Sequence, residues 1–133
     1  MEPVVFGDVE VALADYLGSA FTERMAGATV YNAVPAQRPK RFARVVRVGG
    51  SQANAVTDRP RVVTEFWDTL GVGAYELAAL GRALIVAVAP GYLGEIWVDR
   101  VVDMGLSFSP DPATGSPRYI FPAELWCRGT VLG

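Results

Sequence analysis

The segment SPDPATGSPRYIFPAELWCRG, residues 109–129, decides the fold, because a proline-rich loop runs directly into the alternation of a strand. Successive side chains of a strand point to opposite sides. One side carries residues suited to a core: Tyr119, Phe121, Ala123, Leu125 and Cys127. The other side carries large apolar groups beside charges: Ile120, Pro122, Glu124, Trp126 and Arg128. We therefore expect the first side to cover a core, and the second side needs a cover that the segment does not reveal.

Two segments upstream have the spacing of helices. Asp8 can cap a helix whose apolar residues recur on one side as far as Phe21, and Gly27 can end it. A second helix is expected over residues 73–89, with Pro90 after it. The C-terminal half of this helix is apolar nearly all round, which predicts that two layers cover it.

The other apolar segments have the composition of strands. We expect strands over residues 28–35, 42–48, 59–68 and 95–104, and a short one before the loop that precedes the last strand. The segment SQANAVTD, residues 51–58, is expected to be a polar loop. This order predicts one α+β domain over residues 1–133. It has two layers, with two helices packed on one face of a mainly antiparallel mixed sheet.

The composition excludes several classes of protein. The 133 residues contain no histidine and one cysteine, Cys127, so neither an internal disulfide nor a zinc site of the usual kind can form. The longest apolar run, ALIVAVAP, is far shorter than the roughly 20 residues of a membrane helix. The first residues, MEPVVFGDVE, lack a signal pattern, so we expect synthesis in the cytoplasm and no membrane contact.

Apolar residues make up 51% of the chain and the mean hydropathy is +0.26, values that are high for a small soluble monomer. The surplus fits a large core. It fits equally well a subunit that is partly covered by copies of itself.

The charges are unevenly distributed. The net charge is −2, which excludes a basic field over the whole molecule. No acidic residue lies between Glu23 and Asp58, whereas this window holds Arg24, Arg38, Lys40, Arg41, Arg44 and Arg47. Acidic residues gather elsewhere, as at Glu95, Asp99 and Asp103. A subunit with unlike patches suits head-to-tail association, and a solvated basic loop is the alternative interpretation.

The residues needed for catalysis are scarce. Without histidine, neither a Ser-His-Asp nor a Cys-His arrangement can form, and the carboxylates of Glu95 and Asp99 are typical of a solvated strand. Gly71 and Gly73 precede a helix as in a dinucleotide-binding turn, but Glu76 occupies the position of the third glycine. We predict that the protein is not an enzyme, with no catalytic residue, no cofactor and no metal.

The turn QRPKR, residues 37–41, can project from the sheet and contact phosphates without reading a base sequence. No interleaved aromatic residues support stacking on single strands. In a ring, the repeated turn would either line the lumen or meet an acidic neighbour.

Three stretches together resemble phage tail terminator proteins of the minor tail protein U-like family. DRPRVVTEFWDT followed by AYELAALGRAL resembles their central strand and helix, and PDPATGSPRYIFPAELWCRG resembles their C-terminal loop and last strand. VALADYLGSAF fits their N-terminal helix. The likeness spans most of the chain, is nearest to the versions of long-tailed phages, and is weakest around residues 28–57.

This resemblance implies a structural virion protein. Tail terminators form a hexameric ring that caps the tail tube, stops its polymerisation and joins the tail to the head connector. The implied location is therefore the head–tail interface of a virion, and the implied partners are further copies, tube protein, a connector or stopper protein, and DNA in the lumen. Candidate interface residues are Arg38, Lys40, Arg41, Arg44, Arg47, Tyr119, Phe121 and Trp126.

Two other functions remain open at this point. A head completion or stopper protein has a similar size and also forms rings. A small-molecule-binding domain or an enzyme could instead use the space between the helices and the sheet as a pocket. Ring order, the identity of partners, and whether the basic turn touches DNA do not follow from the sequence.

Overall fold

The computed structural model describes residues 2–132, and it confirms the α+β prediction. The two helices are α1 (Val9–Glu23) and α2 (Gly71–Val86). The strands are β1 (Val4–Val5), β2 (Thr29–Tyr31), β3 (Phe42–Gly49), β4 (Gln52–Asn54), β5 (Thr57–Asp58), β6 (Arg61–Trp67), β7 (Gly91–Leu93), β8 (Ile96–Asp103), β9 (Ser107–Phe108), β10 (Arg118–Arg128) and β11 (Thr130–Val131).

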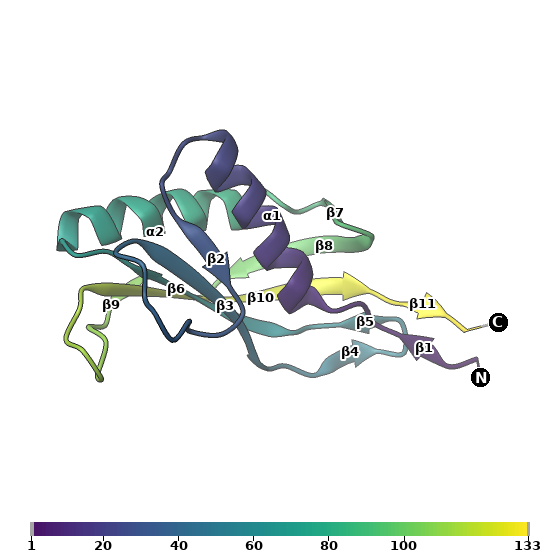
Figure 1. The fold of residues 1–133 in the computed structure, drawn as a ribbon. Coiled ribbons are helices and arrows are strands. Elements are labelled where there is room, and N and C mark those ends of the chain that lie inside the picture. Colours follow the sequence, from purple (N-terminus) through teal and green to yellow (C-terminus); the bar gives the residue numbers. More distant parts are fainter. Residues whose placement is uncertain (1, 133) are drawn as a thin grey trace.

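One mixed sheet forms the lower layer of the molecule and both helices lie on one side of it (Figure 1). The main order is β2-β3-β6-β10-β5-β4, in which β2 and β3 are parallel and the other pairs are antiparallel. The strands β8 and β9 also pair with β10, and β7 forms a hairpin with β8. Because β10 pairs with four other strands, the segment quoted at the outset organises the sheet.

The predicted alternation of β10 is confirmed. Phe121 and Leu125 are fully buried, and Ala123 and Cys127 are 3% exposed. Tyr119 is half-buried at the start of the strand. These side chains face the two helices, whose own buried residues complete a single core. The opposite side of β10 is half-exposed along its length.

The first helix begins where the sequence predicts. The carboxylate of Asp8 accepts hydrogen bonds from the backbone N–H groups of Glu10 and Val11, at 3.1 and 3.3 Å, and so satisfies donors that have no partner within the helix. The helix ends at Glu23, before the predicted stop at Gly27. Met25 adopts a φ of 54°, so the chain reverses without a glycine at that position.

The second helix begins and ends earlier than predicted, spanning Gly71–Val86 in place of residues 73–89. The expectation that two layers cover its C-terminal half is wrong. Val86 is 42% exposed and Ala87 is also exposed, because α2 packs on the sheet with one side only. An apolar exposed side is therefore left on this helix.

Two further predictions need correction. Residues 51–58 form the β4–β5 hairpin and are not an irregular polar loop. A short strand, β7, precedes β8 and was not expected. Among residues 2–132, no helix has both the length and the apolar character to cross a membrane.

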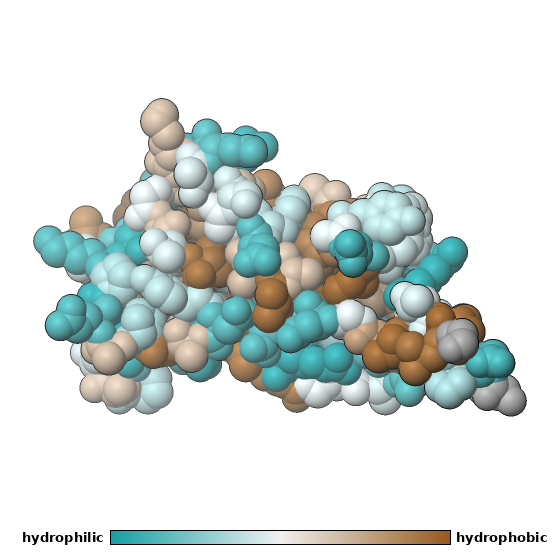
Figure 2. Space-filling model, turned by 45° about the vertical axis from the view of Figure 1, so that its right-hand side comes forward, coloured by the Kyte–Doolittle hydropathy of each residue, from teal (hydrophilic) through white to brown (hydrophobic). Residues whose placement is uncertain are grey.

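The sheet extends beyond the helices into a narrow tip (Figure 1). There the chain ends pair as a small ribbon, β1 with β11. Val5, Val131 and Leu132 are each about half exposed on this tip, and Figure 2 shows apolar surface gathered beside the termini.

Candidate interaction surface

The side of the sheet opposite the helices, hereafter the open face, carries neither a helix nor a second sheet within residues 2–132 (Figure 1), and the loop of residues 109–117 covers one end of it. Its middle is apolar. Val46, Val63 and Pro122 are neighbours across β3, β6 and β10, and each is half-buried. Ile120 and Val102 lie on the same side and are also half-buried. A single copy thus leaves uncovered the side of β10 that the sequence indicated as needing a cover.

A buried carboxylate organises one part of the open face. Glu65 is 5% exposed on β6, between Arg44 on β3 and Arg118 on β10. One oxygen accepts from both Nε, at 3.1 Å, and a terminal nitrogen of Arg44, and the other accepts from Arg118 at 3.1 Å. The opposite charges and hydrogen bonds of the two arginines compensate the water that the Glu65 side chain loses on burial.

A second buried carboxylate lies at the end of the open face. Asp111 accepts hydrogen bonds from Arg38, from the indole N–H of Trp67 at 2.9 Å and from the backbone of Ala113 at 2.8 Å. The Trp67 ring stacks on Phe42 with centroids 4.4 Å apart. The hydrogen bond from Arg38 is the main reason that the pKa of Asp111 is lowered to about 2. This cluster fixes the loop of residues 109–117 over the sheet.

The predicted basic residues are mostly engaged within the subunit. Arg41 donates to Asp68 at 2.6 Å and to two backbone carbonyls, those of Ala26 and Gly73. Burial would raise the pKa of Asp68, but the hydrogen bonds from Arg41 and Thr69 outweigh it, and the pKa is lowered. These bonds tie the basic turn to the segment that follows α1 and to the start of α2.

Arg47 and Lys40 complete the set of candidate basic residues. Arg47 pairs with Asp58 at 3.0 Å. Lys40 is exposed and forms no ion pair with a residue between positions 2 and 132. The four candidate arginines therefore stabilise the fold first, and their contact with a neighbour or with DNA stays a prediction.

The three aromatic candidates lie in different environments. Phe121 is fully buried in the core. Tyr119 is half-buried at one end of the sheet, with its ring 5.5 Å from Tyr75 and 5.2 Å from Phe108. Both of these neighbours are about half exposed, so they form an aromatic surface at the end opposite the tip.

Trp126 lies half-buried on the open face near the tip. Its indole N–H donates to Glu124 at 2.8 Å, and its ring lies between two guanidinium groups, those of Arg59 at 5.6 Å and Arg100 at 4.9 Å. Arg61 is adjacent to Glu124 in the strand register. Sequence reasoning missed these three arginines because they are distant along the chain and only strand pairing brings them to Trp126.

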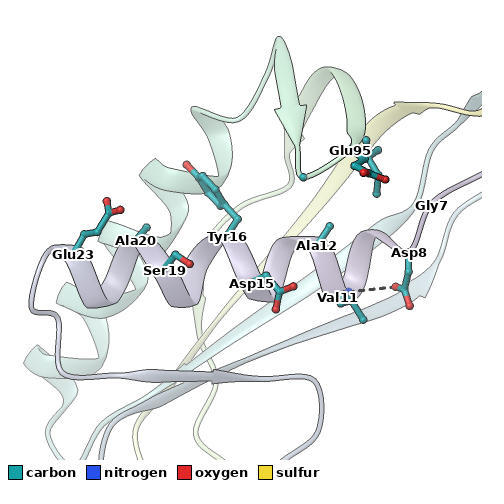
Figure 3. A pocket seen from close by; sticks show the side chains of 12 residues that line it. Gly7, Asp8, Val11, Ala12, Asp15, Tyr16, Ser19, Ala20, Glu23 and Glu95 are labelled. Atoms are coloured by element: carbon teal, nitrogen blue, oxygen red, sulfur yellow. Dashed lines mark hydrogen bonds between the residues drawn. The ribbon is translucent and has the colours of Figure 1, made fainter.

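The other side of the molecule has a groove between α1 and the turn of the β7–β8 hairpin (Figure 3). Its volume is about 660 Å³. Its charged lining residues are all acidic: Asp8, Asp15, Glu23 and Glu95. Tyr16 closes its back by donating its hydroxyl to the carbonyl of Leu84 at 2.9 Å, and burial raises its pKa. The sequence could not reveal this groove, since β7 was not predicted.

The free cysteine, Cys127, is poorly suited to covalent chemistry. Burial raises the pKa of Cys127 to about 12, so its thiol stays protonated at neutral pH and is a poor nucleophile. No group of three or more metal-ligating side chains occurs within residues 2–132. The features that remain are surfaces: an open sheet face, an acidic groove, an apolar tip and an exposed aromatic end.

The Asp111 cluster gives a testable pH dependence. The folded pKa of about 2 lies below the ordinary value of 3.8, so the stabilisation is complete above about pH 4 and is lost as the pH falls through about 2. Asp111→Asn should lower the free energy of unfolding by about 1–3 kcal/mol at pH 7. Urea unfolding should show this deficit shrinking between pH 4 and 2.

Asp99→Asn is the matched control for this experiment, because Asp99 pairs with Arg128 on the surface. It should change stability by less than about 1 kcal/mol at pH 7. A deficit for Asp111→Asn that is equally large at pH 2.5 would show that the charge of Asp111 is not what holds the loop.

The fold has a counterpart among solved structures. A chain from a structure described as "Virion of native gene transfer agent (GTA) particle" superposes with a TM-score of 0.66. The match covers 91% of this chain and 95% of that chain, with 16% sequence identity, a level at which the shared feature is the fold. No protein-family model matches the sequence. No curated protein sequence matches it either.

Proposed function

We propose that the protein is a structural component of a phage-like virion and, within it, a tail terminator. The observation that carries the proposal is the uncovered face of the sheet, where half-buried apolar residues lie beside arginines and Trp126. Such a surface is typical of a subunit whose neighbours complete its burial. The fold shared with a chain of a virion particle supports this interpretation.

In this function the protein forms a ring, hexameric by the family resemblance, at the head–tail interface. The ring caps the tail tube, stops its polymerisation and presents its outer surface to the connector. Neither a catalytic residue nor a cofactor or metal is needed, since the work is done by binding surfaces. The apolar tip and the exposed aromatic end supply two further contact surfaces for tube and connector proteins.

The function is tested by electron microscopy of particles assembled without this protein. A terminator predicts tail tubes of excess and variable length, with filled heads that fail to join them. A head completion or stopper protein instead predicts tails of normal length beside heads that have lost DNA. Tails of normal length that join normally to stable heads would rule out both assignments and favour a pocket-based function.

The basic turn has its own test in the same particles. Arg38→Glu, Lys40→Glu and Arg41→Glu together reverse its charge, whereas Lys40→Glu alone spares the ion pairs of Arg38 and Arg41. If the turn contacts DNA or an acidic neighbour, the single variant should reduce infectious particles without lowering the melting temperature. If Lys40→Glu particles assemble and eject DNA normally, the turn has no such role.

A further inference from the structure

Two surfaces gather charged residues that have no ionic partner among residues 2–132. Seven arginines pair with six carboxylates inside the subunit, Glu65 serving two of them. Among residues 2–132, the basic residues outside these pairs are Arg24, Lys40, Arg59, Arg61 and Arg100. Two of these five, Arg59 and Arg100, lie over the ring of Trp126, and Arg61 is opposite Glu124 on the same side of the sheet. The unpaired carboxylates include all four that line the groove beside α1.

The first surface is the arginine patch, defined as Arg59, Arg61, Arg100 and Trp126. Arg59 and Arg100 lie over the indole ring of Trp126. The Nε of Arg59 donates to the carbonyl of Ser51 at 3.2 Å, which orients its guanidinium. Glu124 offsets only one of the three positive charges. The patch combines the residue types that dominate binding hot spots, an aromatic ring and arginines, and its guanidinium groups, which form no ion pair among residues 2–132, can donate hydrogen bonds to carboxylates.

The second surface is the α1 groove. Val11 and Ala12 of α1 and Ile96 of β8 supply its apolar surface, and Val11 is 46% exposed. Figure 3 shows Asp15 and Glu23 along α1, and Glu95 on the hairpin turn across from Asp8. Asp8 already caps the helix, whereas Asp15, Glu23 and Glu95 have no ionic partner among residues 2–132.

One copy cannot join these two surfaces. The helix α1 packs on the core side of the sheet, while the arginine patch lies on the open face, so the two point away from each other. Two grooves facing each other would bring carboxylates together, and two patches would bring arginines together. Both symmetric arrangements are electrostatically unfavourable.

We infer that the arginine patch of one copy binds the α1 groove of the next copy. Carboxylates of Asp15 and Glu95 accept from Arg59 and Arg100, and Trp126 contacts the apolar wall of the groove. Because the two surfaces are unlike, the contact is head-to-tail, and its repetition builds a ring when the rotation closes. The inference rests on the proposed ring-forming function and assigns the surfaces that join its subunits.

Charge reversal tests the contact by sedimentation equilibrium of the full chain at low salt. Arg59→Glu with Arg100→Glu, and separately Asp15→Arg with Glu95→Arg, should each raise the dissociation constant at least tenfold. An equimolar mixture of the two variants should restore association, because each supplies the intact surface that the other lacks. Salt at about 0.5 M should weaken association of the unaltered protein by a similar factor, since contact charges are then screened.

Two matched controls separate the contact from general charge effects. Arg59→Lys with Arg100→Lys keeps the positive charge but loses the planar guanidinium groups over the Trp126 ring, so it should weaken association clearly less than the charge reversal does. Glu76→Arg reverses an exposed carboxylate of α2 outside the groove and should have no effect.

Three results would overturn the inference. The first is an unaltered protein that stays monomeric up to about 1 mM at low salt. The second is a reversal without effect on association, and the third is a mixture of the two variants that does not associate. None of these results would refute the terminator function, which is tested separately by the tail length of particles. Conversely, normal tails without the protein would refute that function while an observed patch–groove contact remained valid.

Discussion

Replacing Glu65 by alanine should lower the free energy of unfolding by about 3–5 kcal/mol, because it leaves two partly buried arginines without their carboxylate partner. Arg44 and Arg118 lie on the strands either side of Glu65, with side chains 29% and 17% exposed. In the folded protein, Glu65 is the carboxylate with which both arginines pair. Chemical denaturation at neutral pH measures the loss directly. Thermal unfolding should shift down by on the order of 10 °C.

The surface pair of Arg82 and Asp103 is the control for this prediction, since its side chains are 41% and 33% exposed. Asp103→Ala should change stability by less than about 1 kcal/mol. Glu65→Gln keeps the shape of the side chain and one acceptor oxygen. Its loss of stability should therefore lie between the losses of Glu65→Ala and Asp103→Ala. If Glu65→Ala and Asp103→Ala lowered the free energy of unfolding by equal, small amounts, water would reach the open face well enough to solvate the two unpaired arginines.

The fold class follows from the sequence because local signals agree with the global arrangement. Asp8 caps α1 as predicted, and the buried side of β10 matches its alternation. Such patterns depend only on neighbours along the chain. The helix ends were predicted less well. The end of α1 depends on the positive φ of Met25, a conformation that glycine adopts readily and methionine rarely does.

The candidate surface was only partly predictable. That the second side of β10 lacks a cover could be seen in its mixed composition, and the structure places that side on the open face. The contacts of the basic residues between Glu23 and Asp58 could not be predicted from the sequence. Four arginines of this window, Arg38, Arg41, Arg44 and Arg47, pair with carboxylates that lie 11 to 73 residues away along the chain. Within the window only Arg24 and Lys40 have no ionic partner among residues 2–132, and the other unpaired basic residues, Arg59, Arg61 and Arg100, lie outside it.

The contact between Gly81 of α2 and Phe66 of β6 sets the spacing of the two layers. A Cβ atom on Gly81 of α2 would lie 2.3 Å from the Phe66 ring, so only glycine lets the helix approach the sheet this closely. Phe66 is fully buried, and Phe66→Ala should cost about 3–5 kcal/mol. Gly81→Ala alone should also destabilise, because the overlap of about 1–3 kcal/mol outweighs the gain in helix propensity of about 1 kcal/mol.

The two substitutions should be strongly coupled. Once Phe66→Ala removes the ring, Gly81→Ala meets no overlap and should stabilise by about 1 kcal/mol, which reverses its sign. Gly18 of α1 is the matched control, since a Cβ there has no neighbour within 4 Å, and Gly18→Ala should stabilise in either background. A denaturant double-mutant cycle decides the matter. Additive effects at positions 66 and 81 would show that α2 can move off the sheet freely, and Gly81 would then not be what sets the distance between the layers.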